Sequence, residues 1–250
     1  MAEPKLIVDI ITIFPEYFAP ALEVGPLKRA VQNNLITIRF QNLRELADSP
    51  KEIDDYPYGG GSGMVLKPEP VKRALERAGY KDGFVILFSP QGKVLTQSLA
   101  HELVGKRHLI LICGRYKGVD ERSMKYVDLE LSIGDYVLSG GEPAALVLLD
   151  VLVRLIPGAL GDMDSAATDS FESGILDAPY FTRPKVFEGE LVPEVLLSGN
   201  HAAIRRWRRK EALRRTLKKR PDLLEKADLS DEDLELLNEI LHEERRKTDE

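Results

Sequence analysis

The sequence predicts an α/β protein with a parallel β-sheet and a small all-α C-terminal domain. Short runs that are almost wholly apolar, such as 84–88 and 108–113, alternate with longer helical patterns over the first 160 residues. Strands of this kind are typical of parallel sheets that helices cover on both faces. From about Ser198 the pattern is helical to the end of the chain.

The first elements follow from apolar runs and proline positions. Residues 5–12 (KLIVDIIT) form a strand-like run, and residues 35–41 (LITIRFQ) alternate as a half-buried strand does. Between them, Pro15 opens a helix that extends to about residue 33, with a break near Gly25.

Residues 42–67 look like a loop, and a helix is expected over 68–79, where proline stands early and glycine closes the pattern. The remaining strands are expected at 84–88, 108–113 and 128–133, and the remaining helices of this part at about 96–104 and 142–158.

A change of composition divides the chain. Residues 161–178 are small, polar and acidic, which is typical of a linker. We therefore expect one domain over 1–160 and a helical domain over 179–250. The segment before Ser198 is irregular, and Pro221 separates two helices after it.

The composition favours a soluble cytoplasmic protein. The chain has a single cysteine, Cys113, so no disulfide and no cysteine-based zinc site can form within it. No signal-peptide pattern opens the sequence, and no run of about 18 apolar residues is present to span a membrane.

The net charge of −6 hides a segregation of charge. Residues 201–220 carry ten Lys or Arg and one Glu, whereas residues 221–250 carry twelve Asp or Glu and four Lys or Arg. A phosphate backbone responds to the local cluster, so the basic segment is a candidate RNA-binding helix.

Several common sites are missing from the sequence. No window fits the phosphate-binding loop of nucleotide hydrolases, and no dinucleotide-binding glycine motif follows the first strand. The four histidines are scattered, which argues against a triad hydrolase and against a histidine metal cage. The sequence therefore predicts no metal site.

Three polar, glycine-containing loops follow buried strands, at 89–93, 114–122 and 134–142. In parallel sheets, ligands bind beyond the carboxyl ends of the strands, where these loops would converge. Their few formal charges suit an uncharged heterocycle such as adenine, held by backbone hydrogen bonds. The alternative interpretation is that they are simple turns.

Motifs along nearly the whole chain resemble the bacterial tRNA (guanine-37-N1)-methyltransferase family, known as TrmD. They are DDYPYGGGSGM, SPQGK, CGRYKGVDER, SIGDYVLSGGE, DSFESGILDAPYFTRP and LLSGNHAAIRRWR, in that order. The resemblance implies a SPOUT-type fold with a deep trefoil knot, an exception to the usual absence of knots. It also implies a homodimer with active sites shared between subunits, and S-adenosylmethionine bound in a bent shape by the three loops. It assigns that site to Leu87, Ser89, Pro90, Gly114, Tyr116, Ile133, Gly134, Asp135, Tyr136, Val137, Leu138, Gly140 and Gly141.

Methylation of guanine N1 needs a base, because N1 of the neutral base carries a proton. The residues alone offer Asp162, Asp164 and Asp169 as candidate bases in the linker, and Arg154 on the preceding helix as a donor toward O6. The resemblance selects Asp169 and Arg154. The alternatives are a helix N-cap for Asp169 and a solvated helix face for Arg154.

The resemblance assigns RNA contacts to two further segments. The glycine run that begins Tyr58, Gly59 and Gly60 would lie near the flipped-out target base of the anticodon loop, whereas alone it suggests a hairpin tip. The basic helix would contact the tRNA backbone through Arg205, Arg208 and Arg209. The alternative is an amphipathic helix paired with the acidic tail, with Trp207 in the core.

The chain departs from the family at two positions. Lys117 and Thr168 stand where the family usually has Glu. The first Glu is linked in the family to cofactor handling and Mg²⁺ dependence. We therefore expect a less acidic cofactor pocket, and no Mg²⁺ ligands are evident from the sequence. Two alternative hypotheses for the function of the chain are a SPOUT methyltransferase that acts on another RNA and a non-catalytic RNA-binding protein.

Overall fold

The computed structural model describes residues 5–49, 52–160 and 168–249. The chain divides into two compact units, Met1–Met163 and Asp164–Glu250. Each unit contains a hydrophobic core of its own. Ile175 and Ala178, which the sequence placed in a linker, are buried in the core of the second unit. None of the described helices is long and apolar enough to cross a lipid bilayer.

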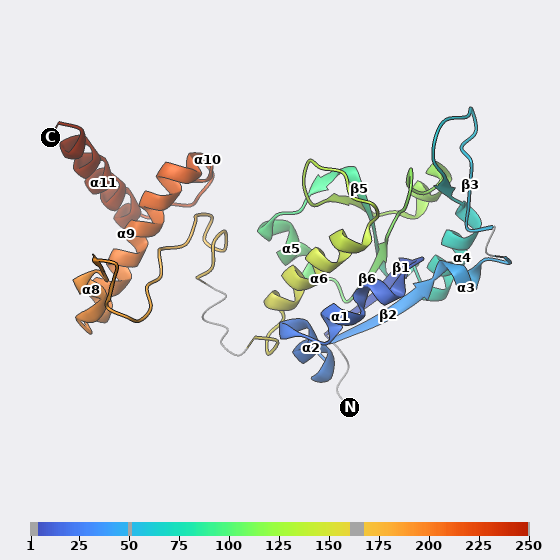
Figure 1. The fold of residues 1–250 in the computed structure, drawn as a ribbon, viewed down its shortest axis with the longest axis horizontal. Coiled ribbons are helices and arrows are strands. Elements are labelled where there is room, and N and C mark those ends of the chain that lie inside the picture. The colour runs from blue at the N-terminus through green and yellow to red at the C-terminus, as the bar shows by residue number, and fades with distance from the viewer. Residues whose placement is uncertain (1–4, 50–51, 161–167, 250) are drawn as a thin grey trace. The chain divides into compact units, whose positions relative to one another are not determined.

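The first unit is built on a parallel sheet of five strands in the order β2-β1-β6-β5-β7 (Figure 1). Every pairing within this sheet is parallel, as the uniformly apolar strands predicted. The strands are β1 (Leu6–Thr12), β2 (Ile36–Asn42), β5 (Phe84–Val94), β6 (His108–Ile112) and β7 (Leu129–Ser132).

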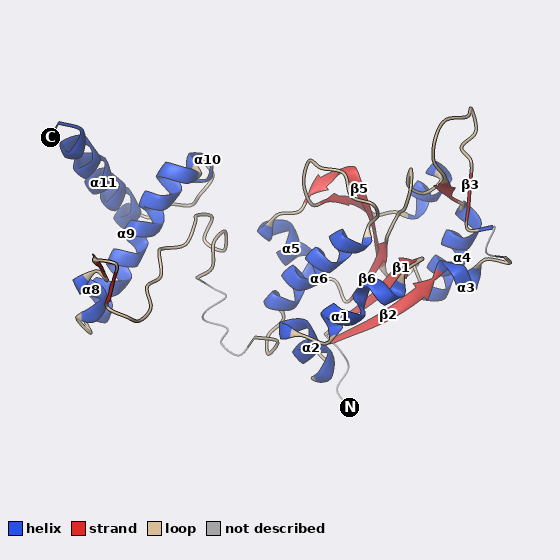
Figure 2. Cartoon of the chain, in the orientation of Figure 1, coloured by secondary structure: helices blue, strands red, loops and turns tan. Residues whose placement is uncertain are grey.

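Successive residues of the central strands enter different cores on the two faces of the sheet. Leu109 and Leu111 of β6 belong to one buried cluster, and Ile110 and Ile112 belong to the other. This is the period of two that a strand imposes on its side chains. Helices cover both faces, so β6 is apolar on both sides (Figure 2).

The helices of the first unit confirm the proline and glycine signals, with one refinement. Gly79 closes α4 with a left-handed φ of 74°, as the C-cap pattern predicted. The segment after Pro15 is three short pieces, since the chain breaks before Gly25. The helices are η1 (Pro15–Phe18), α1 (Ala19–Leu22), α2 (Gly25–Gln32), α3 (Leu43–Leu46), α4 (Pro68–Ala78), α5 (Gln97–Val104), η3 (Glu121–Tyr126) and α6 (Glu142–Leu155).

The prediction of a loop over 42–67 is wrong in part. The Asn42 side chain accepts a hydrogen bond from the Arg44 N–H at 3.0 Å and caps the short helix α3. Further on, β3 (Asp54–Asp55) pairs antiparallel with β4 (Val65–Leu66), which makes the glycine run the tip of a hairpin. These elements are too short for a periodic pattern to show in the sequence.

A buried carboxylate links the strands β1, β2 and β6. Asp9 is fully buried, and its Oδ1 accepts a hydrogen bond from Gln41 Nε2 at 2.8 Å. Its Oδ2 lies 2.7 Å from His108 Nε2 and is paired with the Arg39 guanidinium. Buried polar groups of this kind are retained only when their partners satisfy them.

The second unit is mainly helical, with a small hairpin. The prediction of two helices separated by Pro221 is refined: α10 is a short element, and the second long helix begins at Asp231. The segment expected to be irregular contains two short strands and a short helix. The elements are β8 (Val186–Phe187), β9 (Glu190–Leu191), α8 (Glu194–Leu197), α9 (His201–Lys219), α10 (Pro221–Leu224) and α11 (Asp231–Asp249).

Candidate ligand pocket and RNA-facing surfaces

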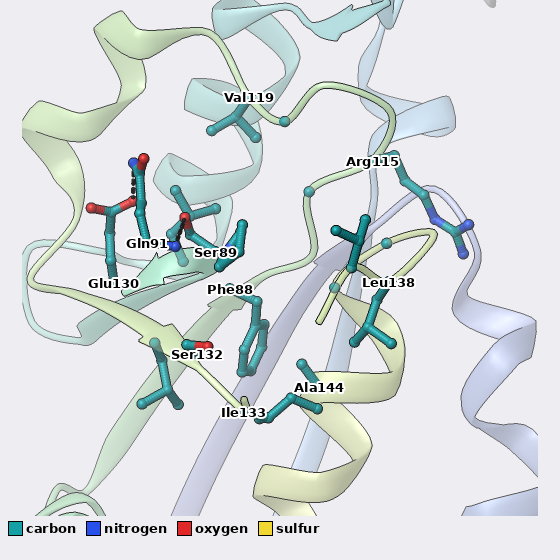
Figure 3. Close-up of a pocket in the computed structure, with 18 of the residues that line it drawn as sticks. Phe88, Ser89, Gln91, Arg115, Val119, Glu130, Ser132, Ile133, Leu138 and Ala144 are labelled. Atoms are coloured by element: carbon teal, nitrogen blue, oxygen red, sulfur yellow. Dashed lines mark hydrogen bonds between the residues drawn. The ribbon is translucent and has the colours of Figure 1, made fainter. Parts of the chain in front are cut away.

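A cavity of about 480 Å³ opens at the carboxyl end of the sheet in the first unit (Figure 3). Residues inside β5 and residues that end or follow β6 and β7 line it, together with Ala144 at the start of α6. Ligand pockets in proteins usually measure about 300–1,000 Å³. The position is the one expected for parallel sheets, whose ligands lie beyond the strand ends.

The structure brings most of the sequence-predicted cofactor residues to this cavity. Asp135 is the exception and does not line it. The residues that do line it are Leu87, Ser89, Pro90, Gly114, Tyr116, Ile133, Gly134, Tyr136, Val137, Leu138, Gly140 and Gly141. Their role in holding a cofactor stays a prediction.

The first lining segment is a bulge inside β5, which corrects the expectation of a loop after a shorter strand. Phe88 and Lys93 both pair with Leu131 of β7, so the residues between them are extra and bow out. Gly92 lies against the backbone of β7, where a Cβ would stand 2.5 Å from Leu131 N. The proline and glycine of this segment made it look like a loop in the sequence, although the strand continues beyond it to Val94.

Two polar side chains brace the bulge at the edge of the cavity. Gln91 Nε2 donates a hydrogen bond to Glu130 Oε1 at 3.0 Å, and the Gln91 N–H donates to Ser89 Oγ at 3.3 Å (Figure 3). Glu130 lies on β7 and also lines the cavity. These two hydrogen bonds therefore fix the conformation of the bulge where it lines the cavity.

The second and third lining segments are joined to each other by backbone contacts. The Gly141 N–H donates to Gly114 O at 2.9 Å, and Arg115 forms an antiparallel bridge with Gly140. A Cβ on Gly141 would lie 2.7 Å from the Cα of Cys113. Only glycine permits so close a backbone approach, which explains the paired glycines in LSGGE.

Burial raises the pKa of the Cys113 thiol well above its ordinary value, and the nearby Glu142 carboxylate adds to this effect. The thiol is fully buried and stays protonated at neutral pH. Cys113 therefore acts as a packing residue under the loops.

The Arg115 side chain points away from the cavity, toward the start of α6 (Figure 3). Its Nε lies 3.0 Å from Oε2 of Glu142, which is fully buried and also accepts a hydrogen bond from Thr12 Oγ1 at 2.7 Å. The guanidinium lies 4.6 Å from the centroid of the Phe14 ring. Neither Arg115 nor Glu142 stands out in the sequence, because the only signal is an acidic residue in the first turn of an apolar helix.

The third lining segment turns sharply at Gly134, whose φ is 144°. The Tyr136 hydroxyl donates to Ile133 O at 2.9 Å and closes this turn. Val137 follows with 92% of its surface exposed. An apolar side chain so exposed at a cavity mouth is available to cover a ligand.

Tyr116 connects the cavity to the β3–β4 hairpin. Partial burial raises the pKa of its hydroxyl, and the hydrogen-bonded Asp54 carboxylate on β3 raises it further. Tyr116 adopts a left-handed φ of 58°, an uncommon conformation for a residue with a side chain. Leu66 of β4 also forms a parallel bridge with Val119, so the hairpin that carries Tyr58, Gly59 and Gly60 is fixed beside the pocket.

The chemistry of the lining fits a largely uncharged ligand of nucleoside size. Backbone groups and small residues contribute much of the surface, and the Arg115 charge is paired with Glu142. The other charged residues of the lining are Lys117, Glu121 and Glu130. Among the residues that the structure describes, no group of three His, Cys, Asp or Glu side chains is placed to hold a metal ion.

The two predicted catalytic residues lie in different units. Arg154 stands in the last turn of α6, and Asp169 belongs to the turn that begins the described part of the second unit. Asp169 is not a helix N-cap: its carbonyl accepts a hydrogen bond from the Glu172 N–H at 3.3 Å within a turn, and no helix follows. The other candidate bases, Asp162 and Asp164, lie outside the described residues.

The turn that holds Asp169 is anchored on α9. The Leu176 N–H donates to Thr216 Oγ1 at 3.0 Å, and Arg215 Nη1 donates to the carbonyls of Asp177 and Ala178. The Asp177 N–H in turn donates to Ser170 Oγ at 3.0 Å. The position of Asp169 within this unit is thus set by hydrogen bonds to a long helix.

The basic helix α9 has a paired face and an open face. Lys210 and Arg214 form ion pairs with Glu243 of α11, and Arg209 pairs with Asp233 of the same helix. This arrangement is the pairing with the acidic tail that the sequence left open as an alternative. Arg205 and Arg208 are exposed.

Aromatic rings lie beside the open face of α9. Arg208 lies 5.7 Å from the centroid of the Tyr180 ring, and Trp207 is half-buried against Phe181, with ring centroids 6.3 Å apart. Of the predicted RNA contacts, Arg205 and Arg208 are available to a ligand, whereas the Arg209 guanidinium is engaged by Asp233.

Fold and pocket together define an α/β protein of the class that holds its ligand beyond the carboxyl ends of parallel strands. The sequence model of the family described as tRNA (Guanine-1)-methyltransferase TrmD matches residues 6–226. The chain belongs to this family.

Individual relatives agree with the family match. A protein of Dictyoglomus turgidum named tRNA (guanine-N(1)-)-methyltransferase is 56% identical over 96% of this chain and 98% of its own length. Proteins of the same name from Dehalococcoides mccartyi and Syntrophomonas wolfei are 52% and 49% identical, each over 96% of this chain and 99% of their own length.

Proposed function

We propose that the protein transfers the methyl group of S-adenosylmethionine to N1 of guanine at position 37 of tRNA. The observation that carries the proposal is the cavity of about 480 Å³ at the sheet edge, lined by the same glycine-rich segments that carry the family motifs. The family match and the names of the relatives support the reaction class. Because its substrate is tRNA, we place the protein in the cytoplasm.

The cofactor would lie in the cavity against the β5 bulge and the segments that join at Gly114 and Gly141. S-adenosylmethionine supplies a methyl group on a positively charged sulfur, which leaves as a neutral thioether. The absence of side chains at Gly140 and Gly141 lets this segment pack closely against Cys113 and Arg115, which sets the shape of the cavity wall. We further propose that the segments around the cavity form the trefoil knot of the SPOUT fold.

Asp169 acts as the general base in this proposal. Its carboxylate takes the proton from guanine N1, and the freed lone pair forms the new bond to the methyl carbon as the bond from carbon to sulfur breaks. A positioned base contributes about 10²–10⁴-fold to such a step. The half-buried position of Asp169 in a hydrogen-bonded turn supports the role, since a base must be both accessible and held.

Arg154 stabilises the negative charge that builds on guanine O6 as N1 loses its proton. A guanidinium can donate two parallel hydrogen bonds, and such donors act most strongly where water is excluded. Arg154 stands ten residues, or about 15 Å, beyond the cavity-lining Ala144 along α6, so in this proposal it acts in a site that is shared with a second copy of the chain.

The target base enters from the side of the β3–β4 hairpin in this proposal. A guanine cannot react at N1 while stacked in the anticodon loop, so it must be turned out. Tyr58 at the hairpin tip is fully exposed, and Gly59 and Gly60 leave room for a base. Arg205 and Arg208 on the open face of α9 would contact the tRNA backbone.

The active form is proposed to be a homodimer that shares each site between two copies. Family membership supports this expectation, and so does an exposed apolar position on α6. Val147 is 43% exposed on a helix whose other apolar residues are buried or half-buried.

Methyl transfer from labelled S-adenosylmethionine to two tRNA transcripts tests the proposal. The transcripts differ only at position 37, where one has guanine and the other adenine. We expect label in the guanine transcript alone. Equal labelling of both transcripts, or of neither, would overturn the proposed function.

A further inference from the structure

Lys117 is a charged residue at the pocket that the proposed reaction does not use. It lines the cavity in the segment that follows β6 and is exposed to solvent. The backbone N–H of Lys117 donates to Met64 O at 3.0 Å, and the backbone N–H of Leu66 donates to Gly118 O at 3.0 Å. These bonds fix the backbone of Lys117 against the base of the glycine-rich hairpin.

The Lys117 side chain runs along the hairpin. Its Cγ and Cε lie 3.0 and 3.2 Å from the point where a Cβ of Gly63 would stand. The ammonium is one bond beyond Cε, so the positive charge lies beside the glycine run. The missing side chain at Gly63 makes this path possible.

The charge of Lys117 is available to a ligand. Within the described ranges, no carboxylate lies within ion-pair distance of its ammonium, whereas the neighbouring cation Arg115 is paired with Glu142. The acidic residues of the hairpin interact with other groups: the Asp54 carboxylate raises the pKa of the Tyr116 hydroxyl, and Asp55 Oδ1 accepts from the Tyr56 N–H at 2.8 Å.

We propose that Lys117 anchors a backbone phosphate of the RNA strand whose base enters the pocket past the glycine-rich hairpin. A lysine ammonium is a compact, well-hydrated point charge, which suits an exposed phosphate better than a buried base edge. The hairpin tip has few side chains, so a cation beside it must supply the contact that holds the strand. This inference rests on the proposed function.

Salt dependence of RNA binding tests the inference. The dissociation constant of a guanine-37 tRNA transcript would be measured over a series of KCl concentrations for the wild type, K117M, K117Q and K117R. One lost phosphate contact lowers the slope of log Kd against log salt by about 0.7–0.9 and weakens binding about ten-fold at low salt. We expect this change in K117M and K117Q, and a near wild-type slope in K117R.

Two controls separate this role from others. K81M removes an exposed lysine in the turn after α4 and should leave the slope unchanged. Titration with S-adenosylmethionine without RNA should give the same affinity in K117M as in the wild type. A loss of that affinity would assign Lys117 to the cofactor and overturn the inference, as would a wild-type slope in both neutral variants. If the wild type itself does not methylate the transcript, the proposed function fails first.

Discussion

The Nε atom of Arg115 lies 3.0 Å from Oε2 of Glu142, and the Glu142 side chain is fully buried. The N–H does not point at that oxygen, so the contact is an ion pair without hydrogen-bond geometry. The pair ties the segment after β6 to the first turn of α6, and both parts line the cavity. It therefore shapes the pocket without facing it.

Replacement of Glu142 by alanine should lower the free energy of unfolding by about 3–5 kcal/mol, because it leaves the largely buried Arg115 charge without a carboxylate partner. Urea unfolding followed by circular dichroism would measure the loss. The double variant R115M/E142L should lose less than E142A, since it removes both charges. A change in E142A below about 1 kcal/mol would show that solvent already compensates Arg115.

Gly141→Ala should damage the cavity, because the new methyl group would meet the Cα of Cys113 at 2.7 Å. Overpacking of this kind costs about 1–3 kcal/mol, enough to weaken S-adenosylmethionine binding about ten-fold or more if the loops shift. Calorimetric titration would measure it. Gly105→Ala, with an ordinary φ of −69° and its nearest neighbour 3.4 Å away, is the matched control. Equal affinity in the two variants would contradict the expectation.

Asp169→Asn should lower kcat about 10²–10⁴-fold, because the amide cannot take the guanine proton. The affinity for S-adenosylmethionine should stay within two-fold of the wild type, since Asp169 and the cavity belong to different units. Asp177→Asn is the control. Asp177 accepts a hydrogen bond from the Tyr180 hydroxyl, so the loss of its carboxylate should affect the stability of the unit and leave kcat unchanged. A normal kcat in the Asp169→Asn variant would show that Asp169 is not the base.

Acid should weaken the second unit through Asp233. The hydrogen-bonded Arg209 guanidinium lowers the pKa of this carboxyl from 3.8 to about 2. A depressed folded-state pKa stabilises the fold above the unfolded value, and the benefit is lost as the pH falls from about 4 to 2. Because the Arg209 side chain is 31% exposed and therefore partly screened by solvent, we expect the loss in the free energy of unfolding to be about 1–2 kcal/mol.

Fluorescence of Trp207, the one tryptophan of the chain, would follow this transition. Asp233→Asn should be less stable than the wild type at neutral pH, and the difference should shrink as the pH approaches 2. Asp222→Asn breaks an ion pair with Arg220 in which both side chains are about half exposed, so its effect should be small at every pH. A constant difference between D233N and the wild type across this range would rule out the linkage.

The glycine run and the basic helix illustrate which features of the site the sequence predicts and which ones only the structure reveals. The sequence identified both segments as candidates for RNA contact. The structure placed the run at the tip of a hairpin joined to the pocket through Leu66 and Val119. It also separated the arginines of α9, since Arg209 pairs with α11 whereas Arg205 and Arg208 stay exposed. Which side of a helix meets a partner depends on packing with distant residues.

The sequence by itself determined the α/β class, the parallel sheet and the family. Each of these follows from local signals: apolar runs, capping glycines such as Gly79, and long motifs in order. Only the tertiary structure showed the bulge in β5, the Arg115–Glu142 pair and the path of Lys117 over Gly63. Those features depend on contacts between residues that lie far apart in the chain, and the spacing of residues along a sequence does not encode which of them will meet.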